Sequence, residues 1–410
     1  MKILILSNFY PPARSGGYTQ LCFEVAEALK ARGHTVEILT SNHRRETAPA
    51  GERGVRRQLH LEGDLYYYQP LDFFLNWRRR QRENGAALRR AVAEFAPDVV
   101  FVWGMWALSR AVPALAEARM PGRVVYYISD YWPAAADPHA EYWNRPARRR
   151  WARPVKAFFR RLAGIVRGDG AAPGLRFERP LIVSRRVRDL LLERGVPLQD
   201  PVVVHCGTDL ARFHGLEPAH PDPARLKLLY AGQMVEDKGV HTAVEALGRL
   251  VAEGWGERVS LTLIGAGHPA YEALIRDLVD RLGLGPQIVY ADPVPRETFP
   301  AFLGRFDVLV FPSVYEEPFA RVVQEAMAAG LVVIGTTTGG TPEILEDGVN
   351  GLAFAPGDAA ALARAVLKLL ETPGLAGALA AAGRRTVFER FDQVKMVNAV
   401  EAYLEEGLRS

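Results

Sequence analysis

Short apolar runs alternate with amphipathic helical patterns along the whole chain, and this alternation restricts the possible folds more than any other feature. Strand-like and helix-like segments that follow one another in turn are typical of parallel sheets covered by helices. The expected strands are residues 2–6, 36–39, 99–103, 124–128, 181–183, 202–205, 227–230, 260–264, 288–290, 308–311 and 332–335. Expected helices include residues 21–32, 240–253, 271–282 and 321–329. The sequence therefore predicts an α/β protein with doubly wound sheets.

A chain of 410 residues exceeds one ordinary core and predicts two domains. The proline-rich residues 215–223 do not suit the interior of a sheet and are the expected linker. We expect a Rossmann-like domain over residues 1–215, a second over 216–391, and a last helix, about 392–410, that packs back on the first. Because ligands bind at the carboxyl ends of such strands, the two domains are expected to face each other across the active-site cleft.

Composition narrows the class of protein. A hydrophobic fraction of 49% and a charged fraction of 24% are typical of a globular chain. Two cysteines, Cys22 and Cys206, make no disulfide framework, which favours a reducing compartment. The first apolar run stops at Ser7 without a cleavage-like site, and no stretch of about 18 apolar residues occurs. We therefore expect a cytoplasmic protein without a membrane span.

Charge is distributed unevenly along the chain. Residues 1–195 hold 33 Lys and Arg against 19 Asp and Glu, whereas the remainder holds 18 against 28. Residues 145–167 contain nine basic and no acidic side chains, interleaved with Trp151, Phe158, Phe159, Leu162 and Ile165. Basic amphipathic stretches bind anionic membranes, so peripheral attachment to the inner face of the membrane is one interpretation and a solvated face the other. Nucleic acid is disfavoured, because no nucleic-acid-binding module is present.

Four glycine-containing turns each follow an expected strand. At such turns the backbone can approach a phosphate beside a helix N-terminus. They lie in residues 11–17, 230–240, 263–267 and 338–343. Lys238, in the second turn, is placed to meet a diphosphate as a point charge. Flexible turns and a solvated lysine are the alternatives for each motif taken alone.

Residues 316–330 carry the strongest local pattern, directly after the expected strand 308–311. Pro318 suits the first turn of a helix and Gly330 suits its end. The apolar positions fall at helical spacing and predict a core-facing stripe of Phe319, Val322, Val323, Ala326 and Met327.

Two carboxylates lie in the same segment as this stripe. Glu317 and Glu325 are eight residues apart, which is about 12 Å along a helix. That separation could span a sugar diphosphate held at the helix N-terminus, whose dipole favours negative charge. Glu317 would then reach a hexose hydroxyl and Glu325 the ribose hydroxyls. A helix cap and a solvated surface carboxylate are the alternatives.

Together these motifs resemble the family 4 (group 1) retaining glycosyltransferases of the GT-B fold, over nearly the whole chain. The Glu317/Glu325 pair is the most specific feature, and Gly339-Gly340 through Glu343 follow in order. The resemblance implies a UDP-, GDP- or ADP-sugar donor, a sugar, lipid-linked or small-molecule acceptor, and retention of anomeric configuration. It also implies that neither a metal nor another cofactor takes part.

The resemblance further implies which residues act. Glu317, Lys238 and Asp130 are the candidate catalytic residues. The donor-binding candidates are Gly16, Gly17, Gln233, Lys238, Gly265, Phe319, Ala320, Arg321, Val322 and Glu325. The chain departs from the family pattern at three places: Gln233 replaces an arginine, Ala320 replaces a glycine, and no histidine precedes Asp130. Arg14, beside the first glycine turn, is our candidate for the missing cation.

Several aromatic residues follow the expected strands of the first domain. Most aromatic residues of the first domain are expected to be ordinary core or packing residues. Trp103 and Trp106 follow one expected strand, and Tyr131 and Trp132 follow another, where aromatic faces suit sugars or apolar acceptors.

Three alternative functions remain open from the sequence. The runner-up enzyme is a GT-B relative that acts on the nucleotide sugar itself, as an epimerase does. A degenerate nucleotide-sugar-binding protein is a further alternative. A two-lobed binding protein of another class is disfavoured because no export signal is found.

Overall fold

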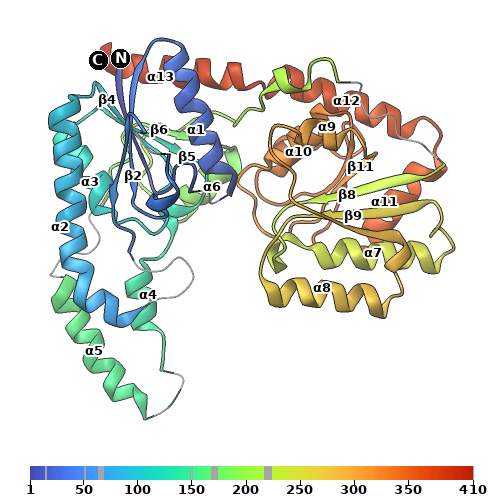
Figure 1. The fold of residues 1–410 in the computed structure, drawn as a ribbon, viewed down its shortest axis with the longest axis horizontal. Helices are drawn as coiled ribbons and strands as arrows, with labels where there is room; N and C mark the ends of the chain where they lie inside the picture. Colours follow the sequence, from blue (N-terminus) through green and yellow to red (C-terminus); the bar gives the residue numbers. More distant parts are fainter. Residues whose placement is uncertain are drawn as a thin grey trace. The chain divides into compact units, whose positions relative to one another are not determined.

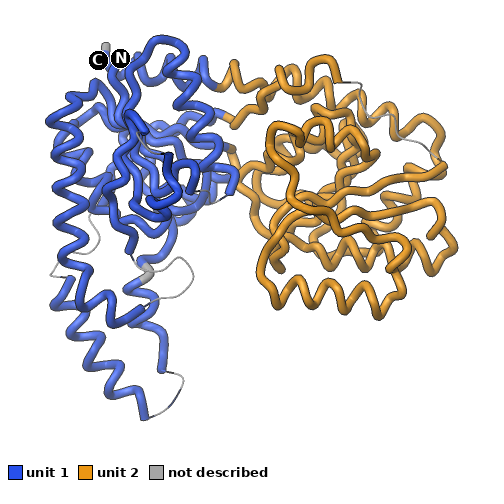
Figure 2. Tube along the Cα trace, in the orientation of Figure 1, with its two compact units in different colours: residues 1–183, 187–204, 397–410 blue, residues 184–186, 205–396 orange. Residues whose placement is uncertain are grey.

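The computed structural model describes residues 1–13, 16–49, 52–62, 69–147, 149, 151–167, 174–216 and 224–409. The chain divides into two compact units (Figure 2). Unit 1 comprises Met1–Val183, Val187–Val204 and Val397–Ser410, and unit 2 comprises Ser184–Arg186 and His205–Met396. The expected boundary at residue 215 therefore lies inside unit 2, and most of the expected linker lies outside the described residues.

The core of unit 1 is a seven-stranded parallel sheet (Figure 1). Its strands are β1 (Lys2–Ser7), β2 (Thr35–Ser41), β3 (Val55–Leu59), β4 (Val99–Val102), β5 (Val124–Ile128), β6 (Pro180–Ile182) and β7 (Val202–Val203). Their order across the sheet is β3-β2-β1-β4-β5-β6-β7, so the direction of winding reverses between β1 and β4. The central strands are apolar along their whole length because helices cover both faces of such a sheet.

Seven helices contribute to unit 1 in the described part of the chain. They are α1 (Gly16–Ala31), α2 (Pro70–Phe95), α3 (Ala111–Arg119), α4 (Pro138–Asn144), α5 (Ala152–Arg167), most of α6 (Arg185–Glu193) and, from Val397 on, α13 (Gln393–Arg409). Arg32, at the end of α1, and His34, before β2, both hydrogen-bond Glu401 of α13, at 2.5 and 2.6 Å. These contacts attach the last helix to the segment between α1 and β2 of unit 1.

Unit 2 repeats the same plan with six parallel strands. They are β8 (Leu226–Ala231), β9 (Val259–Ile264), β10 (Ile288–Ala291), β11 (Val308–Phe311), β12 (Val332–Thr336) and β13 (Leu352–Phe354), in the order β10-β9-β8-β11-β12-β13. The helices are α7 (Val240–Ala252), α8 (Pro269–Arg281), α9 (Phe299–Leu303), α10 (Arg321–Ala328), α11 (Ala359–Glu371) and α12 (Leu375–Arg390). Winding reverses between β8 and β11, which are neighbours in register from Leu228 and Val308.

The predicted α/β class with doubly wound sheets is confirmed, and each expected strand is present within two residues at either end. Two further strands, β3 and β13, were not expected. The sequence of β3 is Val-Arg-Arg-Gln-Leu, whose polar centre suits the edge position that it occupies, and β13 has only three residues. No described helix is long and apolar enough to cross a bilayer alone; α11 and α12 reach that length and composition only jointly, across a bend of 108°.

The prediction of a helix that contains Pro318 in its first turn was wrong. α10 begins at Arg321, and Ala320 before it is extended. The preceding carbonyls bind groups from other segments: Gly340 N–H donates to Glu317 O at 2.7 Å, and Ser184 Oγ donates to Pro318 O at 2.8 Å. Residues 317–320 therefore form a loop, and a helical rise cannot be applied between Glu317 and Glu325.

Candidate functional site

Two loops meet in unit 2 at the point where its sheet changes winding direction. The loop after β8 ends in a short 3-10 turn, Glu236–Lys238, and the loop after β11 contains Glu317. Because β8 and β11 are parallel neighbours, both loops leave the same edge of the sheet. There the Lys238 ammonium forms an ion pair with Glu317 Oε1. The structure thus brings together the two unit 2 residues predicted to be catalytic.

Several contacts hold this pair in place. Ser313 Oγ donates to the same Glu317 oxygen at 2.8 Å, and Lys238 Nζ lies 5.3 Å from the centre of the Tyr315 ring. The two loops are joined by Asp237 O, which accepts the Tyr315 N–H at 3.0 Å. The Lys238 and Glu317 side chains keep 24% and 12% of their surface exposed. The pair is therefore fixed but still accessible to a ligand.

The turn after β12 shapes the backbone of Glu317. A Cβ on Gly339 would lie 2.0 Å from Glu317 O, and Gly339 has a φ of 58°, in the left-handed region. The neighbouring Gly340 donates the hydrogen bond to Glu317 O described above. Only glycine can occupy position 339 without moving the loop that carries Glu317.

The turns after β8 and β9 also approach each other closely. A Cβ on Gly265 would lie 1.7 Å from Gly232 O, and Gly265 has a φ of 139°. Tyr230 OH donates to Gln233 O at 2.7 Å, and burial raises the pKa of Tyr230, so the phenol keeps the proton that it donates. The Gln233 side chain itself is exposed. Lys238, Gly265 and Gln233 thus all lie on turns at one end of the unit 2 sheet.

The helix α10 adds a second group of predicted residues. Its N-cap is Ala320, and no side chain among the described residues caps it, which suits a helix end whose N–H groups receive an anion. Glu325, in the second turn, is only 7% exposed, and its Oε1 lies 3.1 Å from Arg296 Nη2. The alternative of a solvated Glu325 is therefore wrong. Arg296 lies between β10 and α9 and was not predicted, since no motif surrounds it.

Phe319, two residues before the start of α10, stacks on His205, which in turn contacts the half-buried carboxylate of Glu343. The rings of Phe319 and His205 stack at 4.8 Å, and His205 Nε2 lies 2.9 Å from Glu343 Oε2. Burial opposes ionisation of Glu343, but hydrogen bonds from His205 and from the Arg186 and Arg185 N–H groups outweigh it and lower the pKa of this carboxyl. An ionised Glu343 therefore supports the residues that start α10.

The remaining predicted site residues belong to unit 1. Gly16 and Gly17 begin α1 after β1, and Asp130 follows β5. Asp130 is 8% exposed, and its Oδ1 accepts the Trp132 N–H at 2.7 Å. Burial raises the pKa of Asp130 to about 7, against the opposing hydrogen bonds of Trp132 and Trp106. Arg14 lies outside the described residues.

Four aromatic residues at two strand ends of unit 1 were expected to face a ligand, and for three of them this was wrong. Trp103 is fully buried and stacks on Tyr127 at 4.6 Å, and Tyr131 and Trp132 are buried as well. Large aromatic rings pack in the core when the strand ends continue into buried loops. Trp106 is 42% exposed and is the one of the four that could meet a ligand directly.

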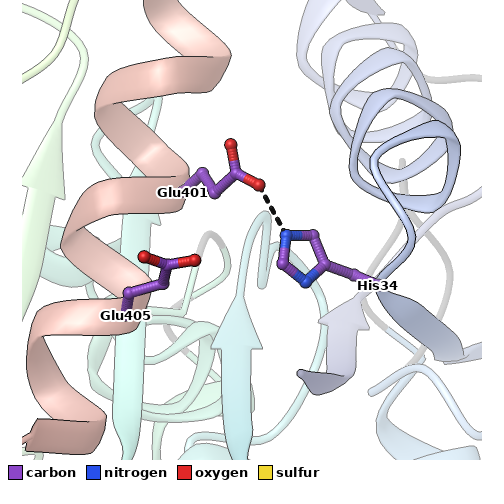
Figure 3. Close-up of side chains that lie close together, drawn as sticks. All are labelled: His34, Glu401 and Glu405. Carbon is purple, nitrogen blue, oxygen red and sulfur yellow. Dashed lines mark hydrogen bonds and ion pairs between the residues drawn. The ribbon is translucent and has the colours of Figure 1, made fainter.

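One group in the described part of the chain has metal-like geometry. The ligand atoms of His34, Glu401 and Glu405 lie within 4.8 Å of one another (Figure 3). Arg32 already forms an ion pair with Glu401, and His34 hydrogen-bonds the same carboxylate. The group lies on α13 and before β2 of unit 1, and we interpret it as an ion-pair network that holds α13.

Comparison with known proteins matches both units. The model described as "Glycosyl transferases group 1" matches residues 218–386, and that described as "Glycosyltransferase Family 4" matches residues 15–212. The chain belongs to the family 4 (group 1) glycosyltransferases. Among relatives, a glycogen synthase of Mycobacterium tuberculosis is 28% identical over 98% of this chain and 94% of its own length.

Solved structures confirm the GT-B fold of this glycosyltransferase. A sucrose-phosphate synthase from Thermosynechococcus elongatus matches with a TM-score of 0.72 and 20% identity, over 99% of this chain and 98% of its own. Anabaena HepE, in complex with UDP-glucose, matches with a TM-score of 0.68 and 19% identity, over 99% and 100% of the two chains. The family matches show that the protein is a glycosyltransferase, and these structures show its fold.

Proposed function

We propose that this glycosyltransferase takes a hexosyl group from a nucleoside diphosphate sugar bound at the carboxyl ends of β8, β9, β11 and β12. The observation that carries the proposal is the Lys238–Glu317 pair at the winding switch of unit 2, where ligands of doubly wound sheets bind. The similar HepE was solved with UDP and with UDP-glucose, which supports a nucleotide-sugar donor. UDP-, GDP- and ADP-sugars all suit this arrangement of charge.

Positive charge from the chain itself would hold the diphosphate. Lys238 supplies a point charge, and the N–H groups of residues 319–322 supply the positive end of the α10 dipole. The Gly265 turn offers further backbone N–H groups at close approach. Gln233 can donate one amide hydrogen bond. We therefore propose catalysis without a metal.

The two carboxylates would bind opposite ends of the donor. Glu317 accepts hydrogen bonds from hexose hydroxyls once the diphosphate has recruited Lys238 from the ion pair. Glu325 accepts from the ribose hydroxyls, and Arg296 stays beside it to offset its buried charge. Each carboxylate can accept paired O–H groups, which suits neighbouring hydroxyls on a sugar ring.

The transfer itself would break the bond between the anomeric carbon and the diphosphate oxygen and form one to the acceptor oxygen on the same face. Lys238 and the α10 N-terminus stabilise the charge that develops on the departing diphosphate. The acceptor hydroxyl loses its proton, for which Asp130 is the proposed base, and the pKa of about 7 suits that role near neutral pH. The acceptor is proposed to be a sugar, a lipid-linked sugar or a small molecule.

Labelled UDP-, GDP- and ADP-glucose, incubated with and without candidate acceptors in EDTA, would test this function. We expect a labelled product only with acceptor, and proton NMR of its anomeric centre should match the donor. An epimerase-like enzyme would consume donor without acceptor, and a degenerate binding protein would bind donor without turnover. The family matches, which are to glycosyltransferases, do not favour the epimerase alternative.

A further inference from the structure

The helix α5 of unit 1 presents a continuous apolar stripe to solvent. Helical spacing places on one side the residues at i, i+4, i+7, i+11 and i+14, namely Trp151, Val155, Phe158, Leu162 and Ile165. Four of these are largely exposed, with exposed fractions of 69% for Trp151, 51% for Val155, 63% for Phe158 and 68% for Ile165. A contiguous stripe of large apolar side chains on a surface marks an interaction site.

The rest of the α5 surface is basic. Residues 145–167 contain no acidic side chain, and the basic residues on and just before the helix that the structure describes are Arg149, Arg153, Lys156, Arg160, Arg161 and Arg167. Arg167 forms an ion pair with Asp137, whereas Arg153, Arg160 and Arg161 have no acidic partner in the described part of the chain. Helical spacing places Arg153 and Arg160 on the side of α5 opposite the stripe and Arg161 between the two sides, so an exposed apolar side and uncompensated positive charge share one helix.

Only a narrow side of α5 packs against its own unit. Ala163 is the one residue of the helix that is fully buried, in a cluster with Phe73 and Trp143. Phe159 contacts Phe74 of α2, with ring centres 5.7 Å apart. Figure 1 shows α5 beside the end of α2 that carries these residues. The exposed stripe is not needed for the core of unit 1.

Polar contacts nevertheless fix α5 firmly at its C-terminal end. The Arg78 guanidinium of α2 donates to Ile165 O and to Val166 O, both at 2.7 Å, and so caps the last turn. The Arg167–Asp137 ion pair joins the same turn to the start of α4. A helix held in this way presents its stripe as part of a formed surface.

We propose that α5 lies in the headgroup region of an anionic lipid bilayer, with its apolar stripe inserted and its basic residues on lipid phosphates. An interfacial helix needs an exposed apolar face and basic residues on its polar face, and α5 has both. A second copy of the chain would place a like-charged helix against this one, which disfavours self-association. A nucleic acid would neutralise the charge but leave the stripe in water. The proposal does not depend on the donor or on the acceptor.

Flotation of the full-length protein with phosphatidylcholine vesicles, with and without phosphatidylglycerol, tests this directly. We expect binding to the phosphatidylglycerol vesicles, weakened by salt, and little binding to pure phosphatidylcholine. The double variant Phe158→Ser/Ile165→Ser should bind at least about tenfold more weakly, because inserted aromatic and branched side chains carry the apolar contribution. Arg153→Gln/Arg160→Gln should lose about fivefold for each charge removed.

Matched controls separate this surface from general effects. Leu274→Ser/Val349→Ser removes two apolar residues of unit 2 with exposed fractions of 49% and 54%, and Arg364→Gln/Lys368→Gln removes two exposed charges from α11. Both control variants should bind vesicles as the native protein does, and thermal melting should show all variants folded.

Three results would overturn the proposal. The first is equal binding to neutral and anionic vesicles, or binding to neither. The second is unchanged binding of the folded Phe158→Ser/Ile165→Ser protein. The third is a pair of results: a single-stranded oligonucleotide displaces the native protein from vesicles, and the Phe158→Ser/Ile165→Ser variant binds that oligonucleotide as tightly as the native protein does. This outcome would assign the basic surface to nucleic acid.

Discussion

Lys238 and Glu317 form an ion pair at the carboxyl ends of β8 and β11, the two strands between which the unit 2 sheet changes winding direction. They are 79 residues apart in sequence, and only the parallel pairing of the two strands makes them neighbours. In the free protein each neutralises the other. A diphosphate sugar would separate their roles, because its phosphates attract the lysine and its hydroxyls attract the carboxylate.

The first prediction follows from this pair. Lys238→Ala should lower kcat/KM for the donor by roughly 10- to 100-fold, since a hydrogen bond to a charged group contributes about 1.5–3 kcal/mol and Glu317 would be left unneutralised beside the phosphates. Steady-state kinetics would measure the effect, with Lys368→Ala on the exposed side of α11 as the control. Equal kcat/KM for native and Lys238→Ala proteins would exclude a diphosphate contact.

The second prediction separates the two carboxylates. Glu325→Ala should weaken binding of the free nucleoside diphosphate by about tenfold or more, because it removes the proposed ribose acceptor, whose Oε1 lies 3.1 Å from Arg296 Nη2. Glu317→Ala should leave that binding nearly unchanged but lower kcat, because the hexose would lose its anchor. Calorimetric titration with nucleotide and kinetics with the donor test both parts. The opposite pattern would reverse the assignment.

The third prediction concerns the turn that shapes Glu317. Gly339→Ala should lower kcat at least about tenfold, since its Cβ would overlap Glu317 O and displace the loop. Gly348 is a matched control, because its φ of 72° is also left-handed but nothing lies within 4 Å of an added Cβ. Gly348→Ala should cost about 1 kcal/mol of stability and keep its activity. Equal losses of activity in Gly339→Ala and Gly348→Ala would show that backbone strain alone, and not displacement of the Glu317 loop, lowers kcat.

The fourth prediction is a pH dependence of stability. The pKa of Asp130 is raised by burial from 3.8 to about 7, so between these values the folded protein binds more protons than the unfolded chain. The free energy of unfolding should then fall as pH rises, by up to about 1.4 kcal/mol per pH unit. Asp130→Asn removes this pH-dependent contribution to stability. The Tm of the variant minus the Tm of the native protein should therefore grow from pH 4 to pH 7 and then level off. A difference in Tm between the two proteins that stays constant from pH 4 to pH 7 would contradict a raised pKa of the buried Asp130 carboxyl.

Much of this site could be predicted from the sequence because strand ends can be located there. Lys238, Gly265 and Glu317 each follow an apolar run, and parallel pairing brings such positions to one edge of the sheet. Arg296 could not be found, since a loop arginine that pairs with a distant glutamate leaves no local pattern. The helical spacing assumed between Glu317 and Glu325 failed because hydrogen bonds from Gly340 and Ser184 hold the intervening residues out of the helix.

The aromatic residues show a second limit of sequence reasoning. Trp103 follows β4. The residue type alone does not decide whether a tryptophan at a strand end is exposed or buried. The contact of Trp103 with Tyr127, a residue of β5, decides in favour of burial, and that contact depends on which strands are neighbours. The basic and apolar pattern of α5 was visible in the sequence, but which side of the helix packs on α2 was not.

Calorimetric titration of UDP, GDP and ADP, in the presence of EDTA, into the native protein and the Lys238→Ala and Glu325→Ala variants tests the central claim most directly. We predict that at least one nucleotide binds the native protein without metal and that both variants bind it at least about tenfold more weakly. Absence of binding until Mg²⁺ or Mn²⁺ is added, or equal affinity in all three proteins, would contradict a metal-free donor site at the winding switch of unit 2.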